Sequence, residues 1–196
     1  MNLTQIPSIC VFCGSSTGND EVFVATARHL GEVIACAGIN LVFGGGNKGL
    51  MGAVADGALS QGGQVIGVIP EFLRNLEHAH ENLTEMHVVD SMHQRKQLMF
   101  NLSDAFVVLP GGVGTLDEVL EMITWKQLKI HEKPIVVVDT NGYWEPLDRL
   151  IASTIGHGFA TPATRHLYKL VRSVGEVITA LKGQLGSAAY TNSSQL

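Results

Sequence analysis

Two charged side chains in this sequence could take part in chemistry. Glu118 follows the string Pro110-Gly111-Gly112-Val113-Gly114-Thr115, and Arg95 lies in Ser91-Met92-His93-Gln94-Arg95-Lys96. A guanidinium presents a planar fork of N–H donors, which can hold a phosphate or the edge of a purine. A carboxylate can stabilise a developing positive charge or accept a proton from water. Because only 16% of the residues are charged, both groups are candidates for a ligand site.

Each of these side chains also has a purely structural interpretation. Ser91 and Gln94 have the spacing of a capping box, so Arg95 could lie on the solvated face of a helix. Thr115 and Glu118 have the same spacing, and an acid in the first helical turn suits the helix dipole. Spacing alone does not separate the two interpretations of Arg95, and for Glu118 it favours the cap.

The glycines suggest where a ligand would bind. Glycine makes up 22 of the 196 residues, and many of the 22 fall in residues 13–18, 44–49 and 110–115, each directly after an apolar run. In parallel α/β sheets the carboxyl ends of the strands form the ligand crevice, where a helix N-terminus can bind phosphate. Glycine at these turns permits positive φ and a close approach of the backbone to a ligand. We therefore expect an anionic ligand, most consistent with a nucleotide, at this edge.

The two common nucleotide fingerprints do not fit these turns. Gly44, Gly46 and Gly49 match G-x-G-x-x-G, but they follow the second predicted strand. The acidic residue expected at the end of the next strand is absent, because that strand ends Val68-Ile69-Pro70. The closing Lys-Ser/Thr of a P-loop is also missing. A dinucleotide or triphosphate site is therefore not favoured.

The elements that must position these residues follow from the hydrophobic pattern. Apolar runs such as 105–109 and 135–138 do not alternate with polar residues, which is typical of strands buried on both faces of a parallel sheet. Their alternation with helical segments predicts an α/β fold with a doubly wound, mostly parallel, Rossmann-like sheet and helices on both faces. We expect strands at 9–12, 41–43, 64–69, 85–89, 105–109, 135–138 and 167–171, and helices at 21–37, 50–61, 92–102, 116–128, 143–157 and 174–181. One nucleotide-binding domain would span 1–182, followed by a polar, flexible tail over 183–196.

Composition excludes several other classes of protein. A formal net charge of −5 gives no general attraction to nucleic acid or to an anionic membrane, so we expect neither as a partner. No apolar run approaches the roughly 18 residues of a membrane span. Residues 1–7 lack a basic segment before an apolar stretch, which favours a cytoplasmic protein over a secreted one. We expect Cys10 and Cys13 to be core residues, and no metal site, because His78 and His80 lack a third ligand.

The string Pro110-Gly111-Gly112-Val113-Gly114-Thr115-Leu116-Asp117-Glu118 resembles the P-G-G-x-G-T-x-x-E motif of a known family. This is the LONELY GUY (LOG) family of cytokinin riboside 5′-monophosphate phosphoribohydrolases, whose members are often labelled lysine decarboxylases. Residues 44–52, 92–96 and 124–128 are similar to three further family segments. The resemblance runs from about residue 9 to 181 and is more specific for the family than for the substrate.

The resemblance implies an activity, a site and an assembly. The reaction would be hydrolysis of the N-glycosidic bond of adenosine 5′-monophosphate (AMP) or an N6-modified form such as isopentenyl-AMP, giving free base and ribose 5-phosphate without a cofactor. Arg95 and Glu118 match the catalytic pair. A homodimer with the site near its interface is also implied. The expected substrate-binding residues are Lys96, Thr124, Gly14, Ser15, Gly111, Gly112, Val113, Gly114 and Thr115.

The implied chemistry suits these residues. Breaking the glycosidic bond builds positive charge on the ribose, which the carboxylate of Glu118 could stabilise while it orients or deprotonates water. Arg95 would hold Glu118, the ribose hydroxyls or the leaving base. Two alternatives stay open: a nucleotide-binding or carrier module without turnover, and a pyridoxal-phosphate decarboxylase. The second is disfavoured because none of the seven lysines has a recognisable Schiff-base context.

Overall fold

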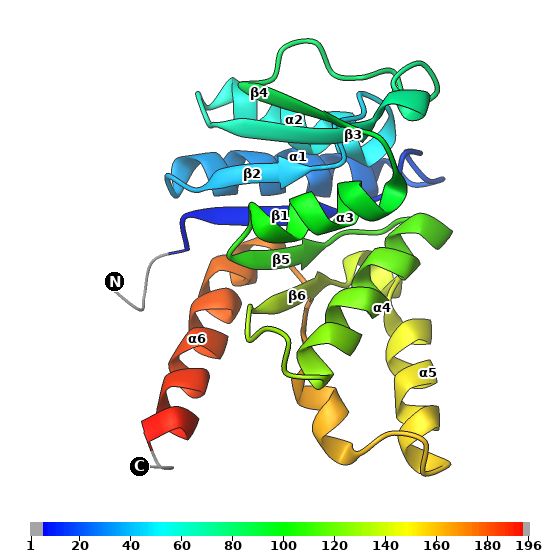
Figure 1. The fold of residues 1–196 in the computed structure, drawn as a ribbon, viewed down its shortest axis with the longest axis vertical. Coiled ribbons are helices and arrows are strands. Elements are labelled where there is room, and N and C mark those ends of the chain that lie inside the picture. Colours follow the sequence, from blue (N-terminus) through cyan, green and yellow to red (C-terminus); the bar gives the residue numbers. More distant parts are fainter. Residues whose placement is uncertain (1–5, 194–196) are drawn as a thin grey trace.

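The computed structural model describes residues 6–193, with side chains described as far as residue 185. Its strands form one seven-stranded parallel sheet in the order β4-β3-β2-β1-β5-β6-β7 (Figure 1). The strands are β1 (Ser8–Phe12), β2 (Asn40–Phe43), β3 (Val65–Pro70), β4 (Glu85–Val89), β5 (Ala105–Val108), β6 (Ile135–Val138) and β7 (Lys169–Val171). The helices are α1 (Glu21–Cys36), α2 (Gly49–Ser60), α3 (Met92–Asn101), α4 (Val113–Gln127), α5 (Glu145–Gly156) and α6 (Val177–Ser193).

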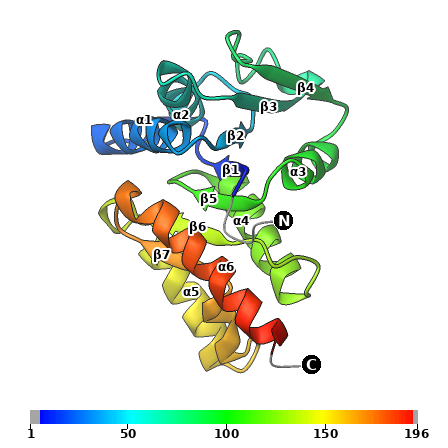
Figure 2. The same cartoon turned by 90° about the vertical axis from the view of Figure 1, so that its left-hand side faces the viewer.

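Helices cover both faces of the sheet, which confirms the predicted doubly wound α/β fold. Figure 2 shows α1 and α2 on one side of the sheet and α3 on the other. One buried cluster joins side chains of α1, α2 and α6 to one face, and a second joins α3, α4 and α5 to the opposite face. Neighbouring strand residues point to different clusters, as Phe106 and Val107 do, and both are fully buried. The continuous apolar runs therefore reflect burial on both faces.

The order of the strands fixes where a ligand crevice can form. The chain moves outward from β1 to β4 and then returns through α3 to place β5 on the other side of β1. β1 and β5 pair directly, with Phe12 opposite Val108. The strand order reverses between these two strands, and in open α/β sheets ligands bind outside the carboxyl ends at such a point.

The end of the chain differs from the expectation. α6 continues to Ser193, so the boundary predicted after residue 182 falls inside a helix. The Gln184 side chain accepts a hydrogen bond from the Ile135 N–H at 3.3 Å and donates one to the Ile135 carbonyl at 3.1 Å. Contacts with the sheet thus extend past residue 182. The flexibility of 183–196 stays a prediction, and residues 194–196 lie outside the described residues. Over the described part, no helix is long and apolar enough to cross a membrane.

Helices α1 and α2 pack unusually closely because each has a glycine at the contact. A Cβ atom on Gly31 would lie 2.1 Å from the Val54 carbonyl oxygen, and one on Gly57 would lie 2.1 Å from the Arg28 carbonyl oxygen. No side-chain rotation can relieve a clash with a backbone atom. This contact determines the distance between α1 and α2, and α2 begins at one of the glycine-rich turns.

Replacing Gly57 with alanine should therefore lower the free energy of unfolding by about 3 kcal/mol, because the two helices must separate. Urea denaturation at neutral pH measures the change. Gly156→Ala is the matched control, since a Cβ there meets nothing within 4 Å. It should leave stability unchanged or raise it by up to about 1 kcal/mol. Equal stability of the Gly57→Ala variant and the wild type would contradict the close-packing argument.

Candidate active site

The three glycine-rich segments are joined to one another through Gly14. Its N–H donates to the Pro110 carbonyl at 3.0 Å, and its carbonyl accepts from the Leu50 N–H at 3.0 Å. Leu50 lies in the first turn of α2, and Pro110 precedes the turn that leads into α4. Two backbone hydrogen bonds thus hold together the carboxyl ends of β1, β2 and β5.

Some of the glycines in these segments are needed for close contacts among the loops themselves. A Cβ on Gly49, whose φ is +60°, would lie 2.4 Å from the Ser15 carbonyl carbon. One on Gly111 would lie 2.1 Å from Thr115 Oγ1. At Gly112 and Gly114, in contrast, an added Cβ would meet nothing within 4 Å. The expectation that glycine lets the backbone approach a ligand therefore fits Gly112 and Gly114. Gly49 and Gly111 instead determine the shape of the loops.

The structure contradicts the capping interpretation of Glu118. α4 begins at Val113 rather than at residue 116, and Gly112 is its N-cap without a side-chain hydrogen bond. Thr115 lies inside the first turn, so it cannot cap the helix with Glu118 as the spacing suggested. The first N–H groups of a helix have no partner within it, and here no side chain takes their place. They form a potential anion site.

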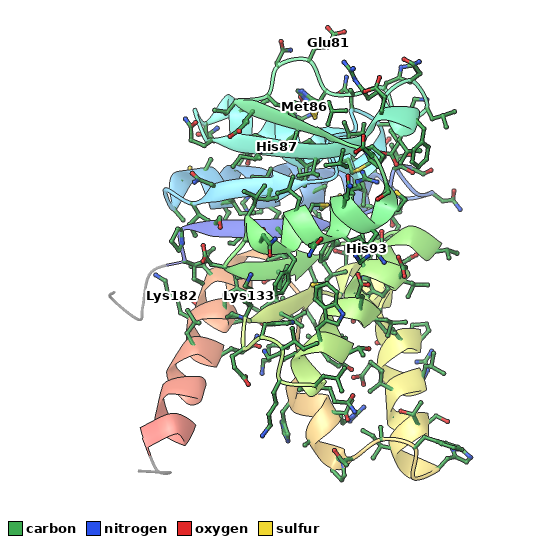
Figure 3. The ribbon with its side chains drawn as sticks, in the orientation of Figure 1. Glu81, Met86, His87, His93, Lys133 and Lys182 are labelled. Atoms are coloured by element: carbon green, nitrogen blue, oxygen red, sulfur yellow. The ribbon has the colours of Figure 1, made fainter. Side chains whose placement is uncertain are left out.

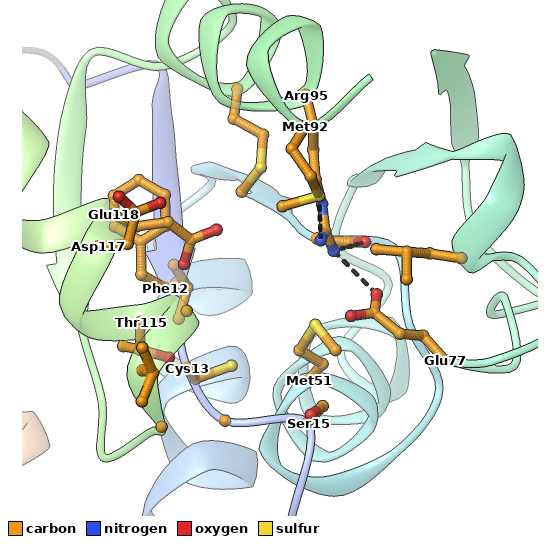
Figure 4. A pocket seen from close by; sticks show the side chains of 18 residues that line it. Phe12, Cys13, Ser15, Met51, Glu77, Met92, Arg95, Thr115, Asp117 and Glu118 are labelled. Carbon is orange, nitrogen blue, oxygen red and sulfur yellow. Dashed lines mark hydrogen bonds and ion pairs between the residues drawn. The ribbon is translucent and has the colours of Figure 1, made fainter. Parts of the chain in front are cut away.

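A cavity of about 270 Å³ opens directly in front of this helix terminus. Figure 4 shows Thr115, Asp117 and Glu118 on one wall and Arg95 and Glu77 on the opposite wall. The β1 end and its loop form the floor between them. The lining residues are Val11, Phe12, Cys13, Gly14, Ser15, Gly44, Met51, Leu73, Glu77, Met92, Arg95, Met99, Gly112, Val113, Gly114, Thr115, Asp117 and Glu118.

Arg95 is held rigidly in this cavity and does not lie on a solvated helix face. Its side chain is 5% exposed. Nε donates to the Val68 carbonyl at 3.0 Å, and Nη2 donates to the Gly44 carbonyl and to Glu77 Oε2, the latter at 3.0 Å. A Cβ on Gly44 would lie 2.3 Å from Nη2, so this position must be glycine for the guanidinium to fit. The predicted cap at Ser91 is present: its side chain accepts from the Gln94 N–H.

Glu77 is a cavity residue that sequence reasoning missed. It lies in the irregular segment after the short 3-10 helix η1 (Glu71–Leu73), and its side chain is 19% exposed. Its carboxylate pairs with Arg95 across a long sequence separation. An acidic residue soon after Pro70 was the available signal, but spacing could not show that Glu77, rather than Glu71, turns into the cavity.

Glu118 is the cavity carboxyl that is left without a hydrogen bond or ion pair to any side chain the structure describes. Burial raises its pKa from 4.5 to about 7. The Arg95 guanidinium opposes this rise, whereas the nearby carboxylates of Asp117 and Glu77 add to it. A carboxyl with such a pKa can both accept and release a proton near neutral pH, as a general acid or base requires.

Lys96 and Thr124 are placed differently from the other predicted site residues. Lys96 Nζ lies 2.9 Å from Asp117 Oδ2 and 3.1 Å from Glu121 Oε2, so it links α3 to α4. Thr124 is exposed further along α4, where its hydroxyl donates to the Leu120 carbonyl at 2.7 Å. Neither side chain lines the cavity formed by the described residues. Their roles in binding stay predictions.

The cysteines and histidines do not form a second centre. Cys10 and Cys13 are buried and form no disulfide, as expected of core residues, and burial raises the pKa of both thiols. His80 is 6% exposed and its Nε2 lies 3.2 Å from Asp56 Oδ1, so it is packed into the fold. Within residues 6–185, no group of three His, Cys, Asp or Glu side chains could hold a metal ion.

The raised pKa of Glu118 predicts a pH-dependent cost to stability. The folded chain binds this proton more tightly than the unfolded chain, so stability falls as pH rises from about 4.5 to about 7. Glu118→Gln removes this contribution. Relative to the wild type, the variant should gain about 2 kcal/mol in its free energy of unfolding between pH 4 and pH 8, measured by urea denaturation.

Glu81→Gln, at an exposed position outside the cavity, is the matched control and should follow the wild type at every pH. An identical pH dependence for Glu118→Gln and the wild type would show that Glu118 titrates normally.

The chain is similar over most of its length to proteins of one family. Residues 51–181 match a family model described as "Possible lysine decarboxylase". The chain is 46% identical over 176 residues to the cytokinin riboside 5′-monophosphate phosphoribohydrolase of Rhodococcoides fascians, and the match covers 89% of each protein. It is 44% identical over 179 residues to the protein of the same name from Arabidopsis thaliana, covering 91% of this chain and 84% of that one.

The fold is also similar to that of a solved carrier protein. The molybdenum cofactor carrier protein of Chlamydomonas reinhardtii superposes with a TM-score of 0.70 at 25% identity, covering 93% of this chain and 99% of that one. The match to the phosphoribohydrolases is closer in sequence and includes the turn before α4, Arg95 and Glu118 within its span. The chain therefore belongs to the LONELY GUY family of cytokinin riboside 5′-monophosphate phosphoribohydrolases.

Proposed function

We propose that the protein hydrolyses the N-glycosidic bond of AMP or of an N6-modified AMP, releasing the free base and ribose 5-phosphate. One observation carries the proposal: the uncapped N-terminus of α4 and the unpaired carboxyl of Glu118 face the same cavity. The first can bind a phosphate, and the second is about one helical turn away along α4. The relatives named for this reaction support the same conclusion.

In this proposal the backbone, rather than the Arg95 side chain, binds the 5′-phosphate. The backbone N–H groups of residues 112–115 bind the 5′-phosphate, with Gly14 and Ser15 on the facing loop and Gly111 shaping the turn. The positive end of the α4 dipole suits a dianion. This arrangement matters because the Arg95 charge is already neutralised by Glu77, so that a phosphate gains little from that cation.

The proposed reaction uses Glu118 to manage charge and one proton. As the C1′–N9 bond breaks, its electron pair leaves with the base and positive charge builds on the ribose, which the carboxylate stabilises. Water then adds to C1′ and gives a proton to Glu118. The base takes up a proton from solvent at the nitrogen that held the bond, and Glu118 releases the proton it took from water to solvent, so one water is consumed in all. A pKa of about 7 lets Glu118 return to its starting state at neutral pH.

We assign a positioning and donor role to Arg95. Three of its bonds are committed to Val68, Gly44 and Glu77, whereas Nη1 has only the Met92 sulfur at 4.0 Å among its described contacts. Nη1 is therefore the nitrogen that can donate to a ribose hydroxyl or to the leaving base. The fixed orientation of the guanidinium means that little conformational entropy is lost when it does so.

Two other functions receive less support. A carrier without turnover is consistent with the fold, but the protein relatives at 42–46% identity bear the name of the hydrolase. A pyridoxal-phosphate decarboxylase needs a lysine in its site, and none of the seven lysines lines the cavity. Figure 3 shows that Lys133 and Lys182 lie at the opposite end of the sheet from the carboxyl edge.

The reaction is tested by following free base with purified protein. The wild type should release adenine from AMP, or the modified base from isopentenyl-AMP, and none from the corresponding nucleosides. Glu118→Gln should lower kcat by at least about 100-fold while AMP still binds, because the carboxylate acts in the transition state. Glu81→Gln should retain full activity. Saturable AMP binding without base release by the wild type would favour the carrier, and full activity of Glu118→Gln would refute the assigned role.

We also propose that the protein is a homodimer. A cytoplasmic location stays a prediction from the sequence. One face of α4 and the residue at its C-terminal end expose three apolar side chains: Val113 (84% exposed), Leu120 (40%) and Leu128 (64%). Thr124 lies on the same face between Leu120 and Leu128. An exposed apolar stripe of this kind fits a contact with a second copy. It would also give Thr124 a place near a neighbouring site.

Sedimentation velocity should therefore give twice the 21.0 kDa mass of one chain. Leu128→Glu should produce a monomer, because it buries a charge in the contact. Leu150→Glu, at a 60% exposed position on α5, should leave the mass unchanged. A monomeric wild type, or a dimeric Leu128→Glu variant, would contradict this assembly.

A further inference from the structure

The phosphate turn has a side-chain contact from a distant part of the chain. The Tyr143 hydroxyl donates a hydrogen bond to the Gly111 carbonyl. Tyr143 directly follows the short helix η2 (Thr140–Gly142) after β6, where Asn141 and Gly142 have φ of +53° and +74°. Its ring packs edge-on against Phe23 and Trp144, with centroids 5.8 Å and 5.0 Å away. Tyr143 is 41% exposed, and its ring is positioned by this turn and by the two aromatic contacts.

This contact determines how the peptide between Gly111 and Gly112 is oriented. A trans peptide is planar, so its carbonyl and its N–H point in opposite directions. Gly111 and Tyr143 line a second cavity of about 250 Å³ together with Phe23, and neither lines the active-site cavity. Gly112 lies on the boundary and lines both. A carbonyl turned toward Tyr143 therefore turns the Gly112 N–H toward the active-site cavity.

The orientation needs such a restraint. Two consecutive glycines can rotate the peptide between them at low cost, because neither has a Cβ to limit φ and ψ. An added Cβ at Gly112 would meet nothing within 4 Å, so no packing at that position limits its φ. Its own carbonyl accepts from the Leu116 N–H at 3.1 Å, but this bond does not fix the Gly111 carbonyl. If the peptide turned over, its carbonyl oxygen would face the cavity and repel an anion.

We propose that Tyr143 is a positioning residue of the phosphate site: its hydroxyl holds the Gly111–Gly112 peptide so that the Gly112 N–H faces the ligand phosphate. The inference rests on the proposed function to the extent that the ligand carries a 5′-phosphate. Tyr143 acts through the backbone and does not touch the reacting atoms. Its loss should weaken ground-state binding of phosphate and leave the bond-breaking step nearly unchanged.

Tyr143→Phe tests this directly, since it keeps the ring and both aromatic contacts. Binding is compared in the Glu118→Gln background, which should bind AMP without turning it over appreciably. Isothermal titration calorimetry with AMP and with inorganic phosphate should show that adding Tyr143→Phe raises Kd about tenfold for both, as expected for one lost hydrogen bond to an anion. In the base-release assay KM should rise by a similar factor, with kcat within twofold. Tyr168→Phe is the matched control, because its hydroxyl bonds Asp148 at 2.8 Å away from the cavity. It should change neither constant.

A second variant removes the N–H that Tyr143 is proposed to orient. Gly112→Pro requires only a modest backbone change, because φ must move from −88° toward the value of about −65° that proline adopts, and an added Cβ meets no atom within 4 Å. It should weaken AMP binding about as much as Tyr143→Phe, and the double variant should be no weaker than either single one. Additive losses would show that the two residues act independently and would overturn the proposal.

The outcomes separate this inference from the proposed reaction. AMP binding without base release by the wild type would refute the reaction, while the binding comparison would still decide the role of Tyr143. An unchanged Kd for Tyr143→Phe, or an equal loss for Tyr168→Phe, would overturn the inference even if the enzyme is active. A wild type that binds neither AMP nor inorganic phosphate would overturn both.

Discussion

The two hydrogen bonds made by the backbone of Gly14 are the constraint on which the site depends. They fix the β1 loop to the turn before α4 on one side and to the first turn of α2 on the other. Each loop can come this close only because glycine occupies the contact, as Gly49 and Gly111 do. The cavity, the free N–H groups of α4 and the position of Glu118 on that helix all follow from this arrangement.

The same arrangement leads to an uneven distribution of charge in the cavity. Arg95 is inserted between the ends of β2 and β3 and is neutralised by Glu77. Lys96 is committed to Asp117 and Glu121 on the rim. Glu118 is left as an unpaired, partly buried carboxyl, and its burial raises its pKa. An anionic ligand therefore relies on backbone dipoles, whereas a cationic transition state has a carboxylate available.

The sequence was sufficient for the sheet and most helices, and insufficient for the details of the site. Runs such as 135–138 predict strands correctly because burial on both faces leaves no polar positions in them. The start of α4 was misplaced because Thr115 and Glu118 have the spacing of a cap, while the actual N-cap, Gly112, has no side chain to indicate it. Local pattern alone cannot distinguish these two helix starts.

Residues whose environment comes from distant segments were the hardest to interpret. Arg95 could not be separated from a surface residue because its partners lie in the loop after β2, on β3 and in the irregular segment after η1. Glu77 was missed because that loop has no periodicity. The family resemblance singled out Arg95 and Glu118, and the structure adds the geometry that places both on one cavity. Lys96 and Thr124 lie outside it in a single chain.

A crystal structure of the Glu118→Gln variant with AMP would test the central claim most directly. The account predicts phosphate oxygens within hydrogen-bond distance of the backbone N–H groups of residues 112–115. It also predicts that the side chain at position 118 faces C1′ of the ribose. A phosphate bound to the Arg95 guanidinium, or a ribose with C1′ turned away from position 118, would contradict it.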